Sequence, residues 1–303
     1  MVDTNDEWIV QRTGIRERRI VDENEATSDL AVRAAQQALE RANLLPEDVE
    51  FIAVGTTSPD MIFPTTANIV QHRLGCRRAG SVDMLAACAG SIYSLSVGSA
   101  FIQSGKYKRV LCIGAETLSR ITDFTDRGTC VLLADAAGAA VLEASEDERG
   151  IIDFDLYSDG QYWDLLYMPG GGSRHPATKE TVDARMHFAK MKGQRGVQGR
   201  RPPVRGLRRA NPRAQRIHGE GREPVHSASG QFEDHRGGRQ ACRPPDGRGS
   251  SSNVDRYGNT GAASVYVALE EANARWTTEA WRSCAHQWPS GAVSPWGAAS
   301  CGV

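Results

Sequence analysis

Helix and strand patterns alternate along the first half of the chain, and this alternation restricts the possible folds more than any other feature. Apolar side chains repeat at helical spacing over 30–39, and a second helix is expected over 66–74. The run 51–57 is typical of a buried strand, and 80–84 has the pattern of a shorter one. Strands that alternate with helices form sheets covered by helices, so we expect an α/β fold.

Four further apolar segments follow a helix that begins near Cys88. Each is rich in Val, Leu, Ile or Ala, and each is predicted to be a strand, over 109–115, 128–134, 138–144 and 150–156. Because the last three follow one another without a helical pattern between them, we expect mixed strand pairing at one edge of the sheet.

The overall composition excludes several classes of protein. The 303 residues carry a formal net charge of −1, which gives the whole molecule no attraction to nucleic acids or membrane surfaces. No apolar run approaches the roughly 18 to 20 residues that span a bilayer, and the acidic start of the chain is unlike a signal peptide. The seven cysteines form no CxxC pair, which argues against a disulfide framework and a metal site. We expect a cytoplasmic protein with reduced thiols.

The regular pattern stops at about residue 194. Residues 194–252 contain thirteen arginines, ten glycines and no lysine, without a helical or strand period. A segment of this composition is not expected to fold by itself. Helical patterning returns over 261–272 and fades again from 276 onward.

Cys88 lies where a strand runs into a helix, in the stretch SVDMLAACAGSIYSL. A thiol in the first turn of a helix meets unpaired backbone N–H groups and the positive end of the helix dipole, and both favour the thiolate. The small residues Ala89, Gly90 and Ser91 follow it and leave room for a substrate carbonyl. This pattern is typical of a nucleophile. Free cysteines are also among the most frequently buried residues, and composition alone favours that simpler interpretation.

Five sequence blocks follow one another in a characteristic order: DEWIVQRTGI at 6–15, AACAGSIYSL at 86–95, DRGTCVLLADAAGAAVL at 126–142, SDGQYWDLLYMPGGGSR at 158–174 and NVDRYGNTGAAS at 253–264. In this order they resemble the 3-oxoacyl-[acyl-carrier-protein] synthase III family. The resemblance is nearly continuous over 2–193 and returns over 253–275.

The resemblance implies the thiolase fold, an αβαβα layered sandwich of two similar halves, in a homodimer. The halves would cover 1–150 and 151–303. Members of that family carry a further strand before the first block, so the first strand of the sheet is expected to be missing.

The resemblance also implies a reaction, the condensation that initiates type II fatty acid synthesis. Cys88 would take an acyl group, typically acetyl, from coenzyme A, and malonyl-acyl carrier protein would then decarboxylate and attack the thioester. Acyl-coenzyme A is then a substrate, acyl carrier protein is a partner, and no tightly bound cofactor is expected.

Four more residues match functional positions of the family. Asn259 would donate a hydrogen bond to the thioester or to the enolate formed on decarboxylation. Trp8 and Arg127 would stack on either side of the adenine of coenzyme A, and Arg12 would meet its phosphates. Without the resemblance, Asn259 would be interpreted as a turn residue. Trp8 would then be a core or interface residue, and the two arginines would be solvated surface groups.

The family's catalytic histidine has no match here. His226 and His235 lie near the expected place, but neither has the P-H-Q-A-N surroundings, so the role is assigned to neither. The family's closing Phe-Gly-Gly-Gly motif is also absent.

A change of reading frame would supply both motifs. Read one base later through permitted codons, Ala228–Gln240 spells His-Gln-Ala-Asn-Leu-Arg-Ile-Ile. Read two bases later, Trp288–Pro295 permits Ala-Phe-Gly-Gly-Gly-Phe-Thr. We therefore expect compensating frameshifts over about 194–252 and 276–295, which disrupt the second half, and impaired activity and folding of the chain as translated.

Two other interpretations stay open. Residues 194–252 could be a genuine insertion of net charge about +8, from thirteen arginines and five acidic residues, that binds RNA or another polyanion on an α/β scaffold. Phe232 is the only aromatic residue of this segment, which argues against nucleic-acid binding because single strands are held by aromatic stacking. The chain could also be a related thiolase-fold enzyme that condenses other acyl-coenzyme A substrates.

Overall fold

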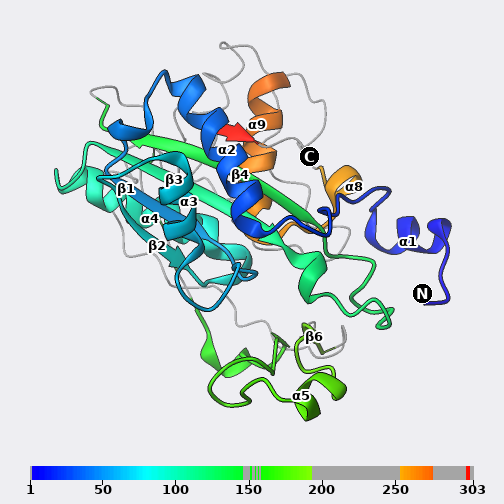
Figure 1. The fold of residues 1–303 in the computed structure, drawn as a ribbon. Helices are drawn as coiled ribbons and strands as arrows, with labels where there is room; N and C mark the ends of the chain where they lie inside the picture. The colour runs from blue at the N-terminus through cyan, green and yellow to red at the C-terminus, as the bar shows by residue number, and fades with distance from the viewer. Residues whose placement is uncertain are drawn as a thin grey trace.

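The computed structural model describes residues 2–145, 158–192, 253–275 and 298–300, together with Ile151, Phe154 and Leu156. The main elements (Figure 1) are α1 Asp6–Thr13, α2 Thr27–Ala42, β1 Phe51–Gly55, α3 Thr66–Leu74, β2 Gly80–Met84, α4 Gly90–Gln103, β3 Arg109–Thr117, β4 Asp135–Glu143, α9 Ser264–Arg275 and β7 Ala298–Ser300. Shorter ones are β5 Leu166–Tyr167, α5 Lys179–Asp183, β6 Lys190–Met191, α8 Val254–Tyr257 and the 3₁₀ turns η2 Ala87–Ala89 and η5 Gly261–Ala263. Across these stretches, none of the helices has the length and apolar character needed to cross a membrane.

Five strands form one mixed sheet in the order β2-β1-β3-β4-β7. β1 runs parallel to β2 and β3, whereas β4 runs antiparallel to β3 and β7. The pairing of β3 with β4 is continuous from Arg109 opposite Glu143 to Thr117 opposite Asp135. The predicted α/β sheet with mixed pairing towards one edge is confirmed.

The strand predicted over 128–134 is wrong. This stretch forms turns, in which the backbone N–H groups of Thr129 and Cys130 donate to the carbonyl of Asp126. Its apolar pattern reflects burial of side chains such as Val131, and β4 begins only at Asp135.

Several other predictions concern residues that the structure does not describe. Most of the strand predicted over 150–156 and the proposed boundary between the two halves lie outside the described residues. The same holds for 194–252 and 276–295, and for His226 and His235.

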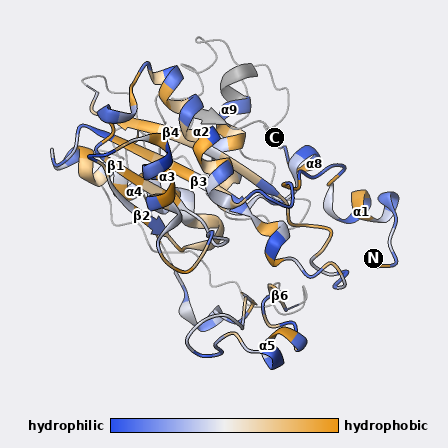
Figure 2. Cartoon of the chain, viewed as in Figure 1, coloured by the Kyte–Doolittle hydropathy of each residue, from blue (hydrophilic) through white to orange (hydrophobic). Residues whose placement is uncertain are grey.

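Helices cover both faces of the sheet (Figure 1). α2 and α3 pack on one face in a cluster that includes Leu30, Val70 and Ile113. α4 and α9 pack on the other face, where Leu95 and Tyr266 join side chains of β3 and β4. Successive residues of a strand point to opposite faces, so β3 is buried on both sides, and Figure 2 shows hydrophobic colour along the strands. Helix, sheet and helix agree with three of the five layers that the resemblance implies.

Glycines allow the helices to approach this sheet closely. A Cβ atom on Gly55, the last residue of β1, would lie 2.4 Å from the carbonyl carbon of Gly90, the first residue of α4. A Cβ atom on Gly138 of β4 would lie 2.4 Å from the Cβ atom of Tyr266. The first contact places the start of α4, and the turn before it, directly over the end of β1.

Residues 158–192 extend from one end of the sheet (Figure 1) and contain α5 and the two-stranded β5–β6 ribbon. This segment is fixed to the sheet domain by a backbone hydrogen bond of 2.8 Å from the N–H of Ala189 to the carbonyl of Ile121, and by ion pairs to Asp123.

Candidate active site

Cys88 lies in η2, the single 3₁₀ turn between β2 and α4. The preceding residue, Ala87, has a φ of 49°, in the left-handed region that residues with a side chain rarely adopt. Within the described part of the chain, Cys76, Cys112 and Cys130 are buried and Cys88 is partly exposed. A strained turn that presents a partly exposed thiol favours the nucleophile over the buried core residue.

The surroundings of Cys88 oppose ionisation. Burial is the larger cause, and the negative charge of Glu116 adds to it, so the pKa of the Cys88 thiol is raised above its ordinary value. The prediction that the helix end favours the thiolate is therefore wrong for this arrangement. The physical reason is that Cys88 sits in the turn before α4, where burial of the sulfur and the charge of Glu116 both oppose the thiolate.

Glu116 is a fully buried carboxylate at the end of β3. It accepts hydrogen bonds from the Ser58 hydroxyl at 2.6 Å, from the Thr57 N–H at 3.1 and 3.2 Å and from the Ala262 N–H at 3.4 Å. Burial raises its pKa above the ordinary value despite these donors. Glu116 thus joins the loop after β1 to η5.

Asn259 reaches the same region from the other end of the chain. Its backbone N–H donates to the carbonyl of Leu132 at 2.9 Å, and its carbonyl accepts from the N–H of Ala134 at 2.9 Å. η5, which follows Asn259, contacts η2, which contains Cys88. The structure therefore brings together the two segments that carry the predicted catalytic residues.

Asn259 is 8% exposed, and its side-chain oxygen accepts the N–H of Gly261 at 3.0 Å. That bond is the one expected of an asparagine in a turn, so the structural interpretation of Asn259 also applies. The two interpretations are compatible, because the bond engages the amide oxygen and the NH₂ group is then the donor that the side chain offers.

Trp8, Arg12 and Arg127 also lie together. The guanidinium carbon of Arg127 is 4.0 Å from the centre of the Trp8 ring, and that of Arg12 is 4.8 Å away. At 4.0 Å, Arg127 is in direct contact with the ring. An adenine can enter between Trp8 and Arg127 only if they separate to about twice that contact distance. The predicted grouping is present, in a closed arrangement.

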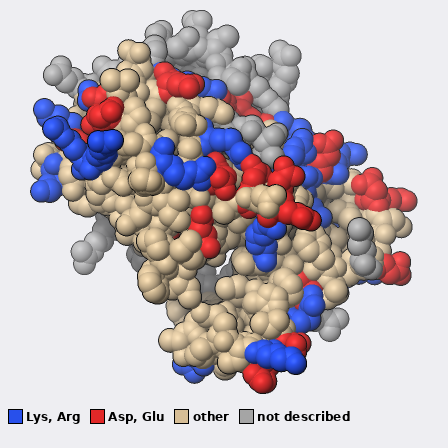
Figure 3. Space-filling view, in the orientation of Figure 1, with Lys and Arg blue, Asp and Glu red and all other residues tan. Residues whose placement is uncertain are grey.

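The described residues place no histidine in the turns around Cys88, and they form no metal site. The histidines among them, His72, His175 and His187, lie outside η2, η5 and the loop after β1. No group of three or more His, Cys, Asp or Glu side chains in these stretches could hold a metal ion. Basic and acidic side chains are interspersed on the face shown in Figure 3.

Two buried acids of this region were missed in the sequence, Glu116 and Asp123. Glu116 had a detectable signal, because a glutamate that ends the apolar run RVLCIGAET has to be buried and hydrogen-bonded. Asp123 had none, since its cationic partners come from a distant segment of the chain.

Comparison with known proteins identifies the family. Residues 82–160 match the family model of 3-oxoacyl-[acyl-carrier-protein (ACP)] synthase III. A beta-ketoacyl-[acyl-carrier-protein] synthase III from Caldanaerobacter subterraneus subsp. tengcongensis is 45% identical over 277 residues, which is 90% of this chain and 82% of the relative. The chain belongs to the beta-ketoacyl-[acyl-carrier-protein] synthase III family. It is thus related to enzymes that transfer acyl groups by condensation in fatty acid synthesis.

Other members of the synthase III family support this assignment, one by its sequence and one by its fold. A member from Syntrophomonas wolfei is 52% identical over 193 residues, which is 64% of this chain and 58% of that protein. The solved synthase III of Thermus thermophilus superposes with a TM-score of 0.67 at 33% identity, over 90% of this chain and 83% of the other. The predicted thiolase-like α/β fold is confirmed.

Proposed function

We propose that this chain is the condensing acyltransferase that initiates type II fatty acid synthesis. In the first step the sulfur of Cys88 attacks the carbonyl of acyl-coenzyme A, typically acetyl, and coenzyme A leaves with the thiol proton. In the second step malonyl-acyl carrier protein loses CO₂, and the resulting carbanion attacks the thioester. A carbon–carbon bond forms, the carbon–sulfur bond breaks, and the Cys88 thiolate is regenerated.

One observation carries this proposal: the turn with the partly exposed thiol of Cys88 contacts the turn that follows Asn259. The NH₂ group of Asn259 would donate to the thioester oxygen or to the enolate as negative charge develops there. Removal of one such donor typically slows a reaction about 10²- to 10³-fold.

The group formed by Trp8, Arg12 and Arg127 would bind the nucleotide end of coenzyme A. Trp8 offers an aromatic face, and the two exposed arginines offer cations for phosphates. Binding would separate Arg127 from Trp8 and place the adenine between them. The substrate is used up in the reaction, so no tightly bound cofactor is required.

We further propose that compensating frameshifts over about 194–252 and 276–295 have removed the catalytic histidine and the Phe-Gly-Gly-Gly motif. Support comes from the arginine-rich composition of 194–252 and from the family motifs that permitted codons can give, in order, in the shifted frames. The two similar halves, 1–150 and 151–303, the homodimer and the cytoplasmic location are part of the same proposal.

Acyl transfer and condensation can be tested separately. The chain as translated and a frame-restored version are each incubated with acetyl-coenzyme A, and acetylation of Cys88 is followed by peptide mass spectrometry. Condensation is then followed with malonyl-acyl carrier protein. We expect both versions to acetylate Cys88, and the translated chain to condense at least about 10²-fold more slowly because it lacks general acid–base help.

The Cys88→Ser variant is the control and should carry no acetyl group at this position. If the frame-restored protein leaves Cys88 unmodified, the proposed function is wrong. Condensation by the translated chain at the rate of the restored one would show that the frameshift proposal is wrong.

A further inference from the structure

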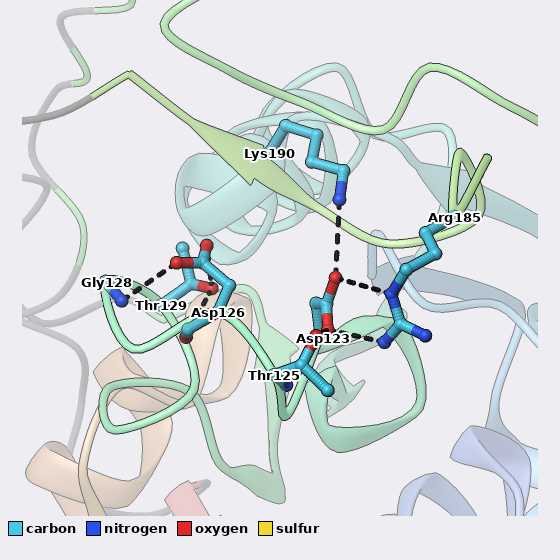
Figure 4. Close-up of polar contacts among 7 residues, drawn as sticks. All are labelled: Asp123, Thr125, Asp126, Gly128, Thr129, Arg185 and Lys190. Atoms are coloured by element: carbon cyan, nitrogen blue, oxygen red, sulfur yellow. Dashed lines mark hydrogen bonds and ion pairs between the residues drawn. The ribbon is translucent and has the colours of Figure 1, made fainter. Parts of the chain in front are cut away.

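Asp123 is a buried acid in the loop that carries Arg127. It is 4% exposed, although loop carboxylates are normally solvated. Arg185 donates to it through Nη2 at 2.5 Å and Nε at 3.0 Å, and Lys190 lies 3.4 Å away (Figure 4). Both cations belong to the 158–192 segment, so Asp123 connects that segment to the loop.

The same carboxylate also holds the loop itself. It accepts the N–H of Thr125 at 3.0 Å and the Thr125 hydroxyl at 2.6 Å. Further along, Asp126 accepts the N–H of Gly128 at 2.9 Å and the Thr129 hydroxyl at 2.7 Å (Figure 4). The backbone on both sides of Arg127 is therefore fixed by hydrogen bonds, while the Arg127 side chain is exposed.

A fixed backbone matters because Arg127 meets Trp8 from a separate part of the chain. Trp8 lies on α1, far from Arg127 in the sequence. The 4.0 Å distance between the Trp8 ring and the Arg127 guanidinium therefore depends on how the two segments are held. A base inserted between them gains stacking energy only if the arginine stays within contact distance of its other face. The anchor of the loop determines whether that geometry is available.

We propose that Asp123 is a positioning residue for the nucleotide end of coenzyme A. Through its ion pairs with Arg185 and Lys190, Asp123 holds the loop so that Arg127 can stack on an adenine that lies against Trp8. The inference rests on the proposed coenzyme A function and extends it to a residue that touches no part of the substrate.

The test compares two ligands that differ only in the nucleotide. Dissociation constants of coenzyme A and of 4′-phosphopantetheine are measured by calorimetry on the full chain. Because base stacking is sensitive to small displacements, we expect Asp123→Asn to weaken coenzyme A binding at least about fivefold. Binding of 4′-phosphopantetheine should stay unchanged. A general loss of structure would weaken both ligands.

Two further variants keep the result interpretable. Arg185→Gln removes the partner from a half-exposed position and should reproduce the selective loss while leaving the buried acid in place. Asp48→Asn is the matched control, because Asp48 likewise accepts a backbone N–H, from Leu45, and pairs with an arginine, Arg109. In this variant, the ratio of the dissociation constants of coenzyme A and 4′-phosphopantetheine should equal that of the unmodified chain.

Trp8→Ala separates failure of the inference from failure of the proposed function. If Trp8→Ala loses the preference for coenzyme A and neither Asp123→Asn nor Arg185→Gln does, the positioning role is wrong and the coenzyme A site stands. If the unmodified chain binds both ligands equally, the nucleotide site and the positioning role are both wrong. An equal loss for both ligands in Asp123→Asn would reduce Asp123 to a purely structural residue.

Discussion

At the scale of single residues, the thiol of Cys88 has to ionise in a place that disfavours charge. Its pKa is raised by burial and by Glu116, so the thiol form dominates at neutral pH. The thiolate is the reactive form, and its share grows about tenfold for each pH unit until the pH passes the raised pKa. Under the proposed function, catalysis by Cys88 would therefore need a neighbouring base, the role that the resemblance gives to a histidine.

This arrangement predicts the pH dependence of alkylation. We expect the rate of Cys88 modification by iodoacetamide to keep rising with pH beyond about 8.5, the ordinary pKa of a cysteine. Peptide mass spectrometry measures it residue by residue, with Cys130 as an internal buried control. A rate that levels off near pH 7 would mean that Cys88 is already a thiolate there.

The sequence was a good guide to which residues meet and a poor guide to their environment. Cys88, Asn259, Trp8 and Arg127 could be picked out by motif, and the structure groups them in two places. The protonation tendency of Cys88 could not be predicted, because it depends on burial and on Glu116, which reaches the site from another strand.

At the scale of elements, the contact between β4 and α9 depends on Gly138, because glycine has no side chain. Tyr266 is fully buried and its hydroxyl lies 3.0 Å from that of Ser94 on α4, so a movement away from Gly138 would break this hydrogen bond. The same helix continues from η5, which contacts the turn of Cys88. A displacement of α9 would thus also disturb the site.

We predict that Gly138→Ala destabilises the protein. The new Cβ atom would lie 2.4 Å from that of Tyr266, and overpacking of this kind typically costs about 1–3 kcal/mol. Urea unfolding measures the loss. Gly172→Ala is the matched control, because no atom lies within 4 Å of its added Cβ, and its effect should stay within about 0.5 kcal/mol. Equal stability of the two variants would contradict the close contact.

Element positions followed largely from apolar periodicity. The strand over 80–84 has the predicted bounds, and the one predicted over 51–57 ends two residues early, at Gly55. The strand predicted over 128–134 was wrong because an apolar run indicates only that side chains are buried. The turn found there is formed by hydrogen bonds to Asp126, which a hydrophobic pattern cannot predict.

At the scale of the whole molecule, Asp123 joins two segments that are far apart in the chain. The Arg185 pair, with the Thr125 donors, holds the pKa of Asp123 well below its ordinary value. A carboxylate with a lowered pKa stabilises the folded state at every pH above its unfolded value of about 3.9, and this contribution is lost as the pH falls towards the folded value. The tie between 158–192 and the sheet domain should therefore persist in mild acid.

We predict that Asp123→Asn lowers the free energy of unfolding by about 1.5–3 kcal/mol, the usual range for hydrogen bonds to a charged group. The difference from the unmodified chain should be the same at pH 7 and pH 5 and should shrink below about pH 4. Urea titrations at each pH measure it. A difference that already disappears between pH 7 and pH 5 would show that the pKa of Asp123 is not lowered.

The contact between Gly138 and Tyr266 has a consequence for synthesis on the ribosome. β4 emerges well before α9, and at about 5–20 residues per second the intervening stretch of roughly 120 residues takes about 6–24 seconds to translate. Throughout that interval α4 is the helix present on this face of the sheet, and the apolar surface of β4 that Tyr266 later covers stays exposed. If translation stalled during this interval, the partly folded chain would be prone to aggregate and would be a substrate for chaperones.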